Sequence, residues 1–305
     1  MNKYDLIIVG GSAAAATAGI YAARRKLKFK IISKDFGGEV STSGEIGNWP
    51  GMSETNGIEL AEKFKEHLKF YKADMEEGVE VVSIKKQEEN FLINTKSGDY
   101  NANAVIVATG VHPKSLNIPG EKEFRNKGVS YCTTCDGPIF KDKTVATIGG
   151  GNSALESALM LADIAAKVYV INKNPEFKGD QILIENLKKK QNVEVIYNTH
   201  TAEIFGDKFV TGLKYIDNDG KEGELKIDGA FIHIGMVPNS NIAPENVEKN
   251  NFGEIIVNQN CETNIPGLYA AGDVTNVPFK QIVIAAGQGC IAALSAVQYL
   301  NRLNT

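Results

Sequence analysis

Two cysteines three residues apart are the sharpest chemical signal in the sequence. They occur in the run Cys132-Thr133-Thr134-Cys135-Asp136-Gly137-Pro138. At this spacing, on a turn or a first helical turn, the two Cα atoms lie about 5 Å apart, within the range that a disulfide needs. A helix start also lowers a thiol pKa and supplies the thiolate that attacks another disulfide. Asp136 is placed to exchange a proton with a sulfur. The pattern predicts dithiol–disulfide cycling at Cys132 and Cys135.

A zinc site is the main alternative for such a pair, but it needs a second pair of ligands. The other cysteines, Cys261 and Cys290, have no neighbouring Cys or His, and the four histidines show no ligand spacing. We therefore expect no metal site. Cys261 and Cys290 are expected to be small buried hydrophobic residues, and His233 is expected to pack in the core from a strand.

Two glycine turns indicate a second chemistry, the binding of phosphate. They read Gly10-Gly11-Ser12-Ala13-Ala14-Ala15 and Gly149-Gly150-Gly151-Asn152-Ser153-Ala154. Between a strand and a helix, such a turn aims backbone N–H groups at a pyrophosphate, and the helix dipole adds a favourable field. Against G-x-G-x-x-G, the first turn is degenerate because Ser12 replaces the second glycine, whereas the second turn departs only at Ala154. A turn that merely packs a helix on a sheet explains one copy more easily than two.

The elements that must hold these residues form two copies of one strand–helix–strand unit, with positions 10 and 149 offset by 139. Two such units predict an α/β fold with two Rossmann-like doubly wound nucleotide-binding domains. The expected elements are strands at 4–9, 28–33, 90–95, 101–108, 143–148, 167–171, 193–197, 210–215 and 229–234, and helices at 13–25, 57–73, about 152–162, 181–190 and 279–300.

Composition narrows the partners. The 305 residues carry 33 Lys and Arg against 37 Asp and Glu, so no basic field exists to hold nucleic acid. A hydrophobic fraction of 43% is ordinary for a globular protein. No run approaches the ~18 uninterrupted apolar residues of a membrane span, and the N-terminal apolar run is too short for a signal peptide. We expect a cytoplasmic protein of about two domains that binds neither nucleic acid nor membrane.

Several segments resemble the low-molecular-weight thioredoxin reductase family, and their order and spacing match essentially the whole chain. Residues 174–181 and 277–282 look closest to the flavoprotein part of bacterial alkyl hydroperoxide reductase, a sister branch. We expect no counterpart here of that protein's extra N-terminal thioredoxin-like region, because the chain begins directly at the first strand. The segments that carry the resemblance are Gly10 to Ala15, Gly37-Gly38-Glu39, Glu45 to Gly51, Ala108-Thr109-Gly110, Cys132 to Pro138, Gly149 to Ala154, and Ala271-Gly272-Asp273 with Lys280-Gln281-Ile282.

The resemblance implies FAD on the first unit and a nicotinamide nucleotide, NADPH or NADH, on the second. It also implies a discontinuous FAD domain, residues 1–112 and 240–305, around a pyridine-nucleotide domain, residues 113–239, that carries the redox pair. The implied FAD-binding residues are Gly10, Ser12, Ala13, Ala14, Gly38, Glu39, Asn48, Thr109, Gly110, Gly272, Asp273, Lys280, Gln281 and Ile282. Those for the nicotinamide nucleotide are Gly149, Gly151, Asn152, Ser153, Ala154, Asn172 and Lys173.

The same resemblance assigns roles within the site. Asn48 lies along the flavin, Asp273 binds the ribityl chain, and Gln281 with Ile282 closes over the ring. Cys135 lies next to the isoalloxazine, and Cys132 attacks the substrate disulfide. Asp136 is the acid and base. The implied catalytic residues are thus Cys132, Cys135 and Asp136.

Two departures from the family pattern bear on function. Glu39 stands where the family has Gln, and Asn172-Lys173-Asn174 stands where its members carry His-Arg-Arg for NADPH or Glu for NADH. An amide hydrogen-bonds either a ribose hydroxyl or a 2′-phosphate, whereas arginine or a carboxylate discriminates. We expect the protein to prefer NADPH or NADH over the other by less than about tenfold. Asn172→Glu should favour NADH, and Lys173→Arg should favour NADPH. A further outcome is that neither nucleotide works well.

The sequence therefore predicts a flavin-dependent disulfide reductase that passes electrons from NAD(P)H through FAD and Cys132–Cys135 to thioredoxin or a thioredoxin-like protein disulfide, as a homodimer. Three alternatives stay open. One is a reductase for a glutaredoxin-like or peroxiredoxin partner, and another takes electrons from ferredoxin. The third is a redox-regulated binding protein without catalysis, which would explain both Ser12 and the absence of arginines at residues 172–174.

Overall fold

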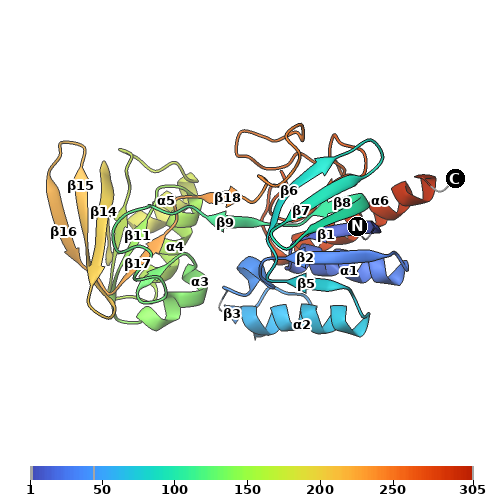
Figure 1. The fold of residues 1–305 in the computed structure, drawn as a ribbon. Coiled ribbons are helices and arrows are strands. Elements are labelled where there is room, and N and C mark those ends of the chain that lie inside the picture. The colour runs from blue at the N-terminus through green and yellow to red at the C-terminus, as the bar shows by residue number, and fades with distance from the viewer. Residues whose placement is uncertain (1–2, 44, 304–305) are drawn as a thin grey trace. The chain divides into compact units, whose positions relative to one another are not determined.

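The computed structural model describes residues 3–43 and 45–303, without the side chains of Glu45 and Cys135. The chain divides into two compact units, Met1–His112 with Val237–Thr305, and Pro113–Met236. Figure 1 shows each unit as strands and helices in alternation, which confirms the α/β class. The chain passes between the units at β9 (Val111–Pro113) and β18 (Met236–Pro238), which pair as a two-stranded sheet.

Unit 1 is built on the first strand–helix–strand unit: β1 (Lys3–Val9), α1 (Ala13–Arg24) and β2 (Phe29–Ser33). Its sheet runs in the order β5-β2-β1-β8-β7-β6, with β19 on β8. The strands β5, β2, β1, β8 and β19 are parallel, and the buried stretches of β1, β8 and β19 are mainly apolar, as expected of strands inside a parallel sheet. The remaining strands are β5 (Met75–Glu77), β6 (Val81–Lys86), β7 (Phe91–Thr95), β8 (Asp99–Val107) and β19 (Leu268–Ala270), with short β3 (Glu45–Ile46) and β4 (Thr55–Asn56) paired apart.

Small residues let two helices of unit 1 pack closely. The C-terminal helix α6 (Ile282–Leu303) lies along α1, where Ala292, Ala293 and Ala296 are fully buried. A Cβ added at Gly289 would lie 2.1 Å from the Ala14 carbonyl oxygen, so the backbones nearly touch. Among the described helices α6 has the length and apolar composition of a membrane span, although Gln288 and Gln298 interrupt its apolar run.

Unit 2 repeats the plan with β11 (Thr144–Ile148), α4 (Asn152–Ala162) and β12 (Lys167–Ile171). Its parallel sheet has the order β10-β17-β11-β12-β13, and a three-stranded antiparallel sheet, β14-β15-β16, accompanies it. The other elements are β10 (Val129–Ser130), α3 (Thr133–Asp136), a 3₁₀ turn at Gly137–Phe140, α5 (Gln181–Lys188), β13 (Val193–Ile196), β14 (Thr199–Gly206), β15 (Val210–Asp217), β16 (Glu222–Lys226) and β17 (Gly229–Ile232).

The expected elements are found, with shorter ends. The expected helix at 57–73 is α2 (Gly57–Phe70), which stops because Lys72 takes a left-handed φ of 53°. The C-terminal helix begins at Ile282 rather than residue 279, and the strand expected to reach residue 234 stops at Ile232. The edge strands β5, β6, β10, β14 and β16 were not predicted from the sequence, nor were β19 and the short β3, β4, β9 and β18.

A chain of buried hydroxyls joins three elements of unit 2. Thr133 Oγ1 at the start of α3 lies 2.6 Å from Ser157 Oγ on α4 and 2.8 Å from His233 Nε2. Ser157 in turn lies 3.3 Å from Thr147 Oγ1 on β11. All three hydroxyls are buried, and burial lowers the pKa of His233 to about 4. The imidazole therefore stays neutral within this network.

His233 makes the stability of unit 2 depend on acid. Its imidazole titrates near 6.5 when unfolded and near 4 when folded, so between these values only the unfolded chain takes up a proton. Stability is complete above pH ~6.5 and falls as pH drops towards 4, by about 2–3 kcal/mol. Melting temperatures of His233→Gln measured from pH 7.5 to 4.5 should decline less than those of the wild type. His200→Gln, exposed on β14, should keep the wild-type slope.

The close approach of α1 and α6 predicts opposite outcomes for two glycines of one helix. Gly289→Ala should lower the stability of unit 1 by about 1–3 kcal/mol, because the new methyl group meets Ala14 backbone atoms. Gly287→Ala meets nothing within 4 Å and should raise stability by about 0.5–1 kcal/mol. Thermal unfolding of both variants checks this, and equal midpoints would contradict the packing.

Candidate functional site

The glycine turn of unit 1 is pressed against the neighbouring strand. Gly10 has a φ of 138°, and a Cβ there would lie 2.1 Å from the carbonyl oxygen of Ala108. Its N–H donates to Ile32 O at 2.9 Å. The turn thus sits where β1, β2 and β8 end, the edge at which parallel α/β sheets bind ligands.

The start of α1 is left free to bind an anion. Ser12 occupies the N-cap position but makes no side-chain capping bond, and the first turn has no acidic residue. By contrast, α2 is capped by its own Asn56, whose Oδ1 accepts from Glu59 N–H at 2.9 Å. Uncapped N–H groups at a helix start are an anion-binding site when a glycine turn opens the approach. Buried Ala13 and Ala14 follow in that first turn.

Several predicted FAD residues, far apart in sequence, lie together in unit 1. A Cβ at Gly38, in the 3₁₀ turn Gly38–Val40, would lie 3.5 Å from Ser12 Cβ, and one at Gly272 would lie 3.2 Å from Ala14 Cβ. Asn48 Nδ2 donates to Gln281 Oε1 at 3.2 Å across 233 positions. Glu39 is exposed, and Ile282 opens α6. The cluster has the glycine cradle and free N–H groups that a dinucleotide such as FAD requires.

Asp273 and Glu254 both lie near Lys280, but only Glu254 forms an ion pair with it. Burial raises the pKa of Asp273, and the nearby Lys280 acts against that rise. Lys280 itself forms an ion pair with Glu254 at 2.8 Å, and its Nζ donates to Thr275 O at 2.6 Å. Asp273 is therefore a partly buried carboxyl suited to accept hydrogen bonds from ligand hydroxyls.

Sequence reasoning missed two side chains that hold the cradle. Asn239 brackets Thr109, because Thr109 Oγ1 donates to Asn239 O and Asn239 Nδ2 to Thr109 O, both at 2.8 Å. Its N–H also donates to Gly110 O at 3.0 Å. Gln288 Oε1 accepts from Gly272 N–H at 2.8 Å. Both partners are remote in sequence, and no local pattern signals them.

The glycine turn of unit 2 has the same geometry. Gly149 has a φ of 146°, and a Cβ there would lie 2.2 Å from His233 O. The N-cap of α4 is Gly151, which has no side chain to cap the helix, and the first turn of α4 carries no acidic residue. Space around Gly151 is open within 4 Å, while Ala154 is fully buried. This turn also fits a phosphate group.

The structure corrects the expected role of Asn172. Its side chain is fully buried, with Nδ2 donating to Glu176 O at 2.9 Å and Oδ1 accepting from Asn174 N–H at 3.1 Å. A Cβ at Gly150 would lie 2.4 Å from that oxygen. Asn172 therefore shapes the loop and cannot read a ribose, so Asn172→Glu would bury a charge rather than favour NADH. Lys173 is exposed beside it.

The loop after β12 folds onto the start of α4. Lys178 N–H donates to Gly150 O at 2.8 Å. Asn152 Nδ2 donates to Asp180 Oδ2 at 3.0 Å, and Asn152 Oδ1 accepts from Asp180 N–H at 2.7 Å. The Asn152 side chain is thus engaged by the loop, while Ser153 stays exposed.

The redox motif lies in unit 2 on the one-turn helix α3. Cys132 is half-buried and disulfide-bonded; the side chain of Cys135 lies outside the described part of the structure. Ser130 Oγ accepts from Cys132 N–H at 3.0 Å and donates to Cys132 O at 3.2 Å. Asp136 is half-buried, and its N–H donates to Cys132 O. Elsewhere, Cys261 is buried and Cys290 half-buried.

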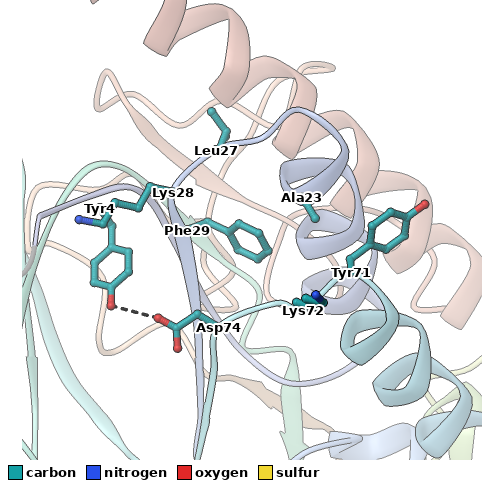
Figure 2. Close-up of a pocket in the computed structure, with 8 residues that line it drawn as sticks. All are labelled: Tyr4, Ala23, Leu27, Lys28, Phe29, Tyr71, Lys72 and Asp74. Atoms are coloured by element: carbon teal, nitrogen blue, oxygen red, sulfur yellow. Dashed lines mark hydrogen bonds between the residues drawn. The ribbon is translucent and has the colours of Figure 1, made fainter.

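A separate surface pocket of unit 1 contains none of the predicted site residues. Figure 2 shows Tyr4, Lys28 and Phe29 lining it with Asp74, whose carboxylate accepts from the Tyr4 hydroxyl at 3.1 Å. Tyr4 and Phe29 lie at the amino ends of β1 and β2, and Lys28 and Asp74 just before β2 and β5, whereas the glycine turn follows the carboxyl end of β1. The pocket therefore lies away from the candidate site.

Comparison with known proteins places this geometry in a family. A family model described as pyridine nucleotide-disulphide oxidoreductase matches residues 4–289. One of the subunits of alkyl hydroperoxide reductase in Escherichia coli is 42% identical over 310 residues, covering 100% of this chain and 60% of its own. The chain thus spans about 60% of the length of the curated relatives it matches.

Two solved structures are similar over nearly their whole length. Thioredoxin reductase of T. acidophilum is 40% identical with a TM-score of 0.77, covering 99% of this chain and 100% of that one. A ferredoxin-flavin thioredoxin reductase of Clostridium acetobutylicum is 32% identical with a TM-score of 0.56, covering 100% and 99%. These matches confirm the resemblance expected from the sequence and the two Rossmann-like domains. The chain belongs to the pyridine nucleotide-disulphide oxidoreductase family, whose members are oxidoreductases that use FAD and NAD(P)H.

Proposed function

We propose that the chain is a flavin-dependent disulfide reductase that passes electrons from NADPH or NADH through FAD and Cys132–Cys135 to thioredoxin or a thioredoxin-like protein disulfide. The observation that carries the proposal is the redox motif, with Cys132 in a disulfide, in a chain that matches a thioredoxin reductase over 99% of its length. The similarity to a subunit of alkyl hydroperoxide reductase also supports a peroxiredoxin-type partner, and we propose a homodimer from the family resemblance.

The two units divide the cofactors. We assign FAD to residues 1–112 and 240–305 and the nicotinamide nucleotide to residues 113–239. Free N–H groups at the start of α1 suit the FAD pyrophosphate, and Asp273 suits the ribityl hydroxyls. Asn48 and Gln281, already hydrogen-bonded to each other, suit the ring. When bound, FAD accepts a hydride from the nicotinamide and supplies two electrons to a disulfide.

The protein's own cysteines carry the electrons onward. Two electrons and two protons convert the Cys132–Cys135 disulfide to two thiols. The Cys132 thiolate then attacks the partner disulfide, forming a mixed disulfide and releasing one partner thiolate. Cys135 attacks Cys132 sulfur, restores the internal disulfide and frees the second thiolate. Asp136 supplies and accepts the protons. The net reaction oxidises one NAD(P)H and reduces one protein disulfide.

Ferredoxin as electron donor is the second candidate. Two observations favour it. The first is the match to a ferredoxin-flavin thioredoxin reductase. The second is the end of β12, where Asn172 is buried and residues 172–174 include neither an arginine nor a carboxylate to bind a ribose. In that case the redox pair and its partner chemistry are unchanged, and only the first electron transfer differs.

An anaerobic spectral titration tests the proposal. The purified yellow protein should lose its flavin absorbance with NADPH, NADH or reduced ferredoxin, and reduce a thioredoxin disulfide in stoichiometric amount. Cys135→Ser should keep the bleaching but lose disulfide reduction, because the internal disulfide cannot form. A colourless protein, or a Cys135→Ser variant that reduces thioredoxin normally, would refute the reductase. Bleaching by ferredoxin alone would select the second candidate.

The Asn172 geometry predicts a loss of affinity without a change of preference. Asn172→Ala removes the bonds to Glu176 and Asn174, so the loop that folds on the glycine turn loosens. The dissociation constants of NADPH and NADH should rise by a similar factor, about 5–20-fold for one or two lost hydrogen bonds. Titration calorimetry of both nucleotides measures this. Lys173→Arg, exposed and outside these bonds, should shift the ratio towards NADPH instead.

A further inference from the structure

The residue before the redox motif is held by a buried carboxylate that the proposed reaction does not use. Glu121 is 1% exposed. Its Oε1 accepts from the Tyr131 hydroxyl at 2.6 Å and from Leu116 N–H at 2.8 Å, and its Oε2 accepts from Asn117 N–H at 2.6 Å. A carboxylate is strongly disfavoured in a protein interior unless donors surround it, so these three bonds must form together for Glu121 to stay buried.

These bonds join two segments of unit 2. Leu116 and Asn117 follow soon after the chain enters this unit at Pro113. Tyr131 and Cys132 lie between the end of β10 and the start of α3. The first turn of α3 holds the Cys132 carbonyl oxygen through Asp136 N–H. Side chains add further contacts: Ser130 on the Cys132 backbone, and Glu121 on the Tyr131 hydroxyl.

The Tyr131 hydroxyl keeps its proton and so can donate a hydrogen bond to Glu121. Its ring packs partly buried against the apolar cluster around Phe124 and Val129, with the Arg125 guanidinium 5.3 Å from the ring centre. Burial, followed by the bond to Glu121, raises the pKa of Tyr131 to about 12. The phenol therefore remains protonated at physiological pH, and Glu121 keeps its third hydrogen bond.

We propose that Glu121 and Tyr131 are positioning residues that stabilise the disulfide-bonded form of Cys132. The hydrogen bond between the Tyr131 hydroxyl and Glu121, called the tie below, is formed in a structure in which Cys132 is disulfide-bonded. Loss of the tie should therefore loosen the segment that carries Tyr131 and Cys132 and make the disulfide easier to reduce. The inference rests on the proposed function only in that Cys132 and Cys135 cycle between disulfide and dithiol.

Tyr131→Phe tests the tie with the least disturbance, because it removes one hydroxyl and leaves both backbone bonds of Glu121. The holoprotein is equilibrated in dithiothreitol redox buffers, where each dithiothreitol that forms its ring disulfide gives two electrons and two protons to the pair. Thiols are then alkylated and counted by mass spectrometry on the peptide that contains residues 132 and 135. The equilibrium constant for disulfide formation should fall about tenfold, a midpoint about 30 mV less negative.

Two further variants make the outcome decisive. Tyr215→Phe, half-buried against the same apolar cluster, should keep the wild-type midpoint. Glu121→Gln should shift it in the same direction as Tyr131→Phe, and the double variant by clearly less than the sum of the two shifts, because both changes act on the bond between Tyr131 and Glu121. The Tyr131 hydroxyl also contacts Ser115, so Tyr131→Phe keeps a smaller effect of its own. A Tyr131→Phe midpoint equal to wild type, or additive shifts in the double variant, overturns the inference.

The titration separates this inference from the proposed function. It uses dithiothreitol alone, so it gives an answer whether or not thioredoxin is the substrate. A wild-type pair that cycles while Tyr131→Phe behaves as wild type refutes the tie and leaves the reductase standing. A wild-type pair that forms no disulfide in any buffer refutes the reductase, and the tie with it.

Discussion

The contact on which both units depend is the approach of a glycine to the carbonyl of the adjacent strand. In unit 1 the carbonyl of Ala108, just after β8, would lie 2.1 Å from a Cβ at Gly10. In unit 2 the carbonyl of His233, just after β17, would lie 2.2 Å from a Cβ at Gly149. No side chain fits at either place, and both glycines have left-handed φ values. In each unit the glycine contact lies where parallel strands end, at one edge of the sheet, and the helix that follows the turn starts at that edge.

The starts of α1 and α4 carry no side-chain cap, a feature they share with α5, where Asp180 makes no capping bond, but only α1 and α4 follow a glycine contact of this kind. A turn that is already anchored by the glycine contact needs no capping side chain to fix the entry of the chain, and neither α1 nor α4 has one. Their first N–H groups stay available for a ligand. The helix α2, which has no such turn before it, is capped by Asn56. An anion is therefore the natural completion of α1 and α4.

The features that could be predicted from the sequence are those whose cause is local. A glycine turn between an apolar run and an Ala-rich run specifies a strand, a turn and a helix within thirty residues, and both copies were found. Asn172 was misjudged because its burial depends on a loop that folds back through Lys178 onto Gly150, which no periodicity encodes. Asn239 and Gln288 escaped for the same reason: each is recognised only by its partner at Thr109 or Gly272.

The two chemistries of unit 2 share one residue. The carbonyl of His233 packs on the glycine turn at Gly149, while its ring nitrogen lies 2.8 Å from Thr133 at the start of the redox helix. Ser157, on the helix that follows the same turn, holds the same threonine hydroxyl from the other side. Because these bonds are buried, moving α3 away from the turn would leave polar groups unpaired, at a cost of about 1–3 kcal/mol each. Separation of α3 from the glycine turn therefore has to break these bonds, so the network couples the position of Thr133 to that of the turn.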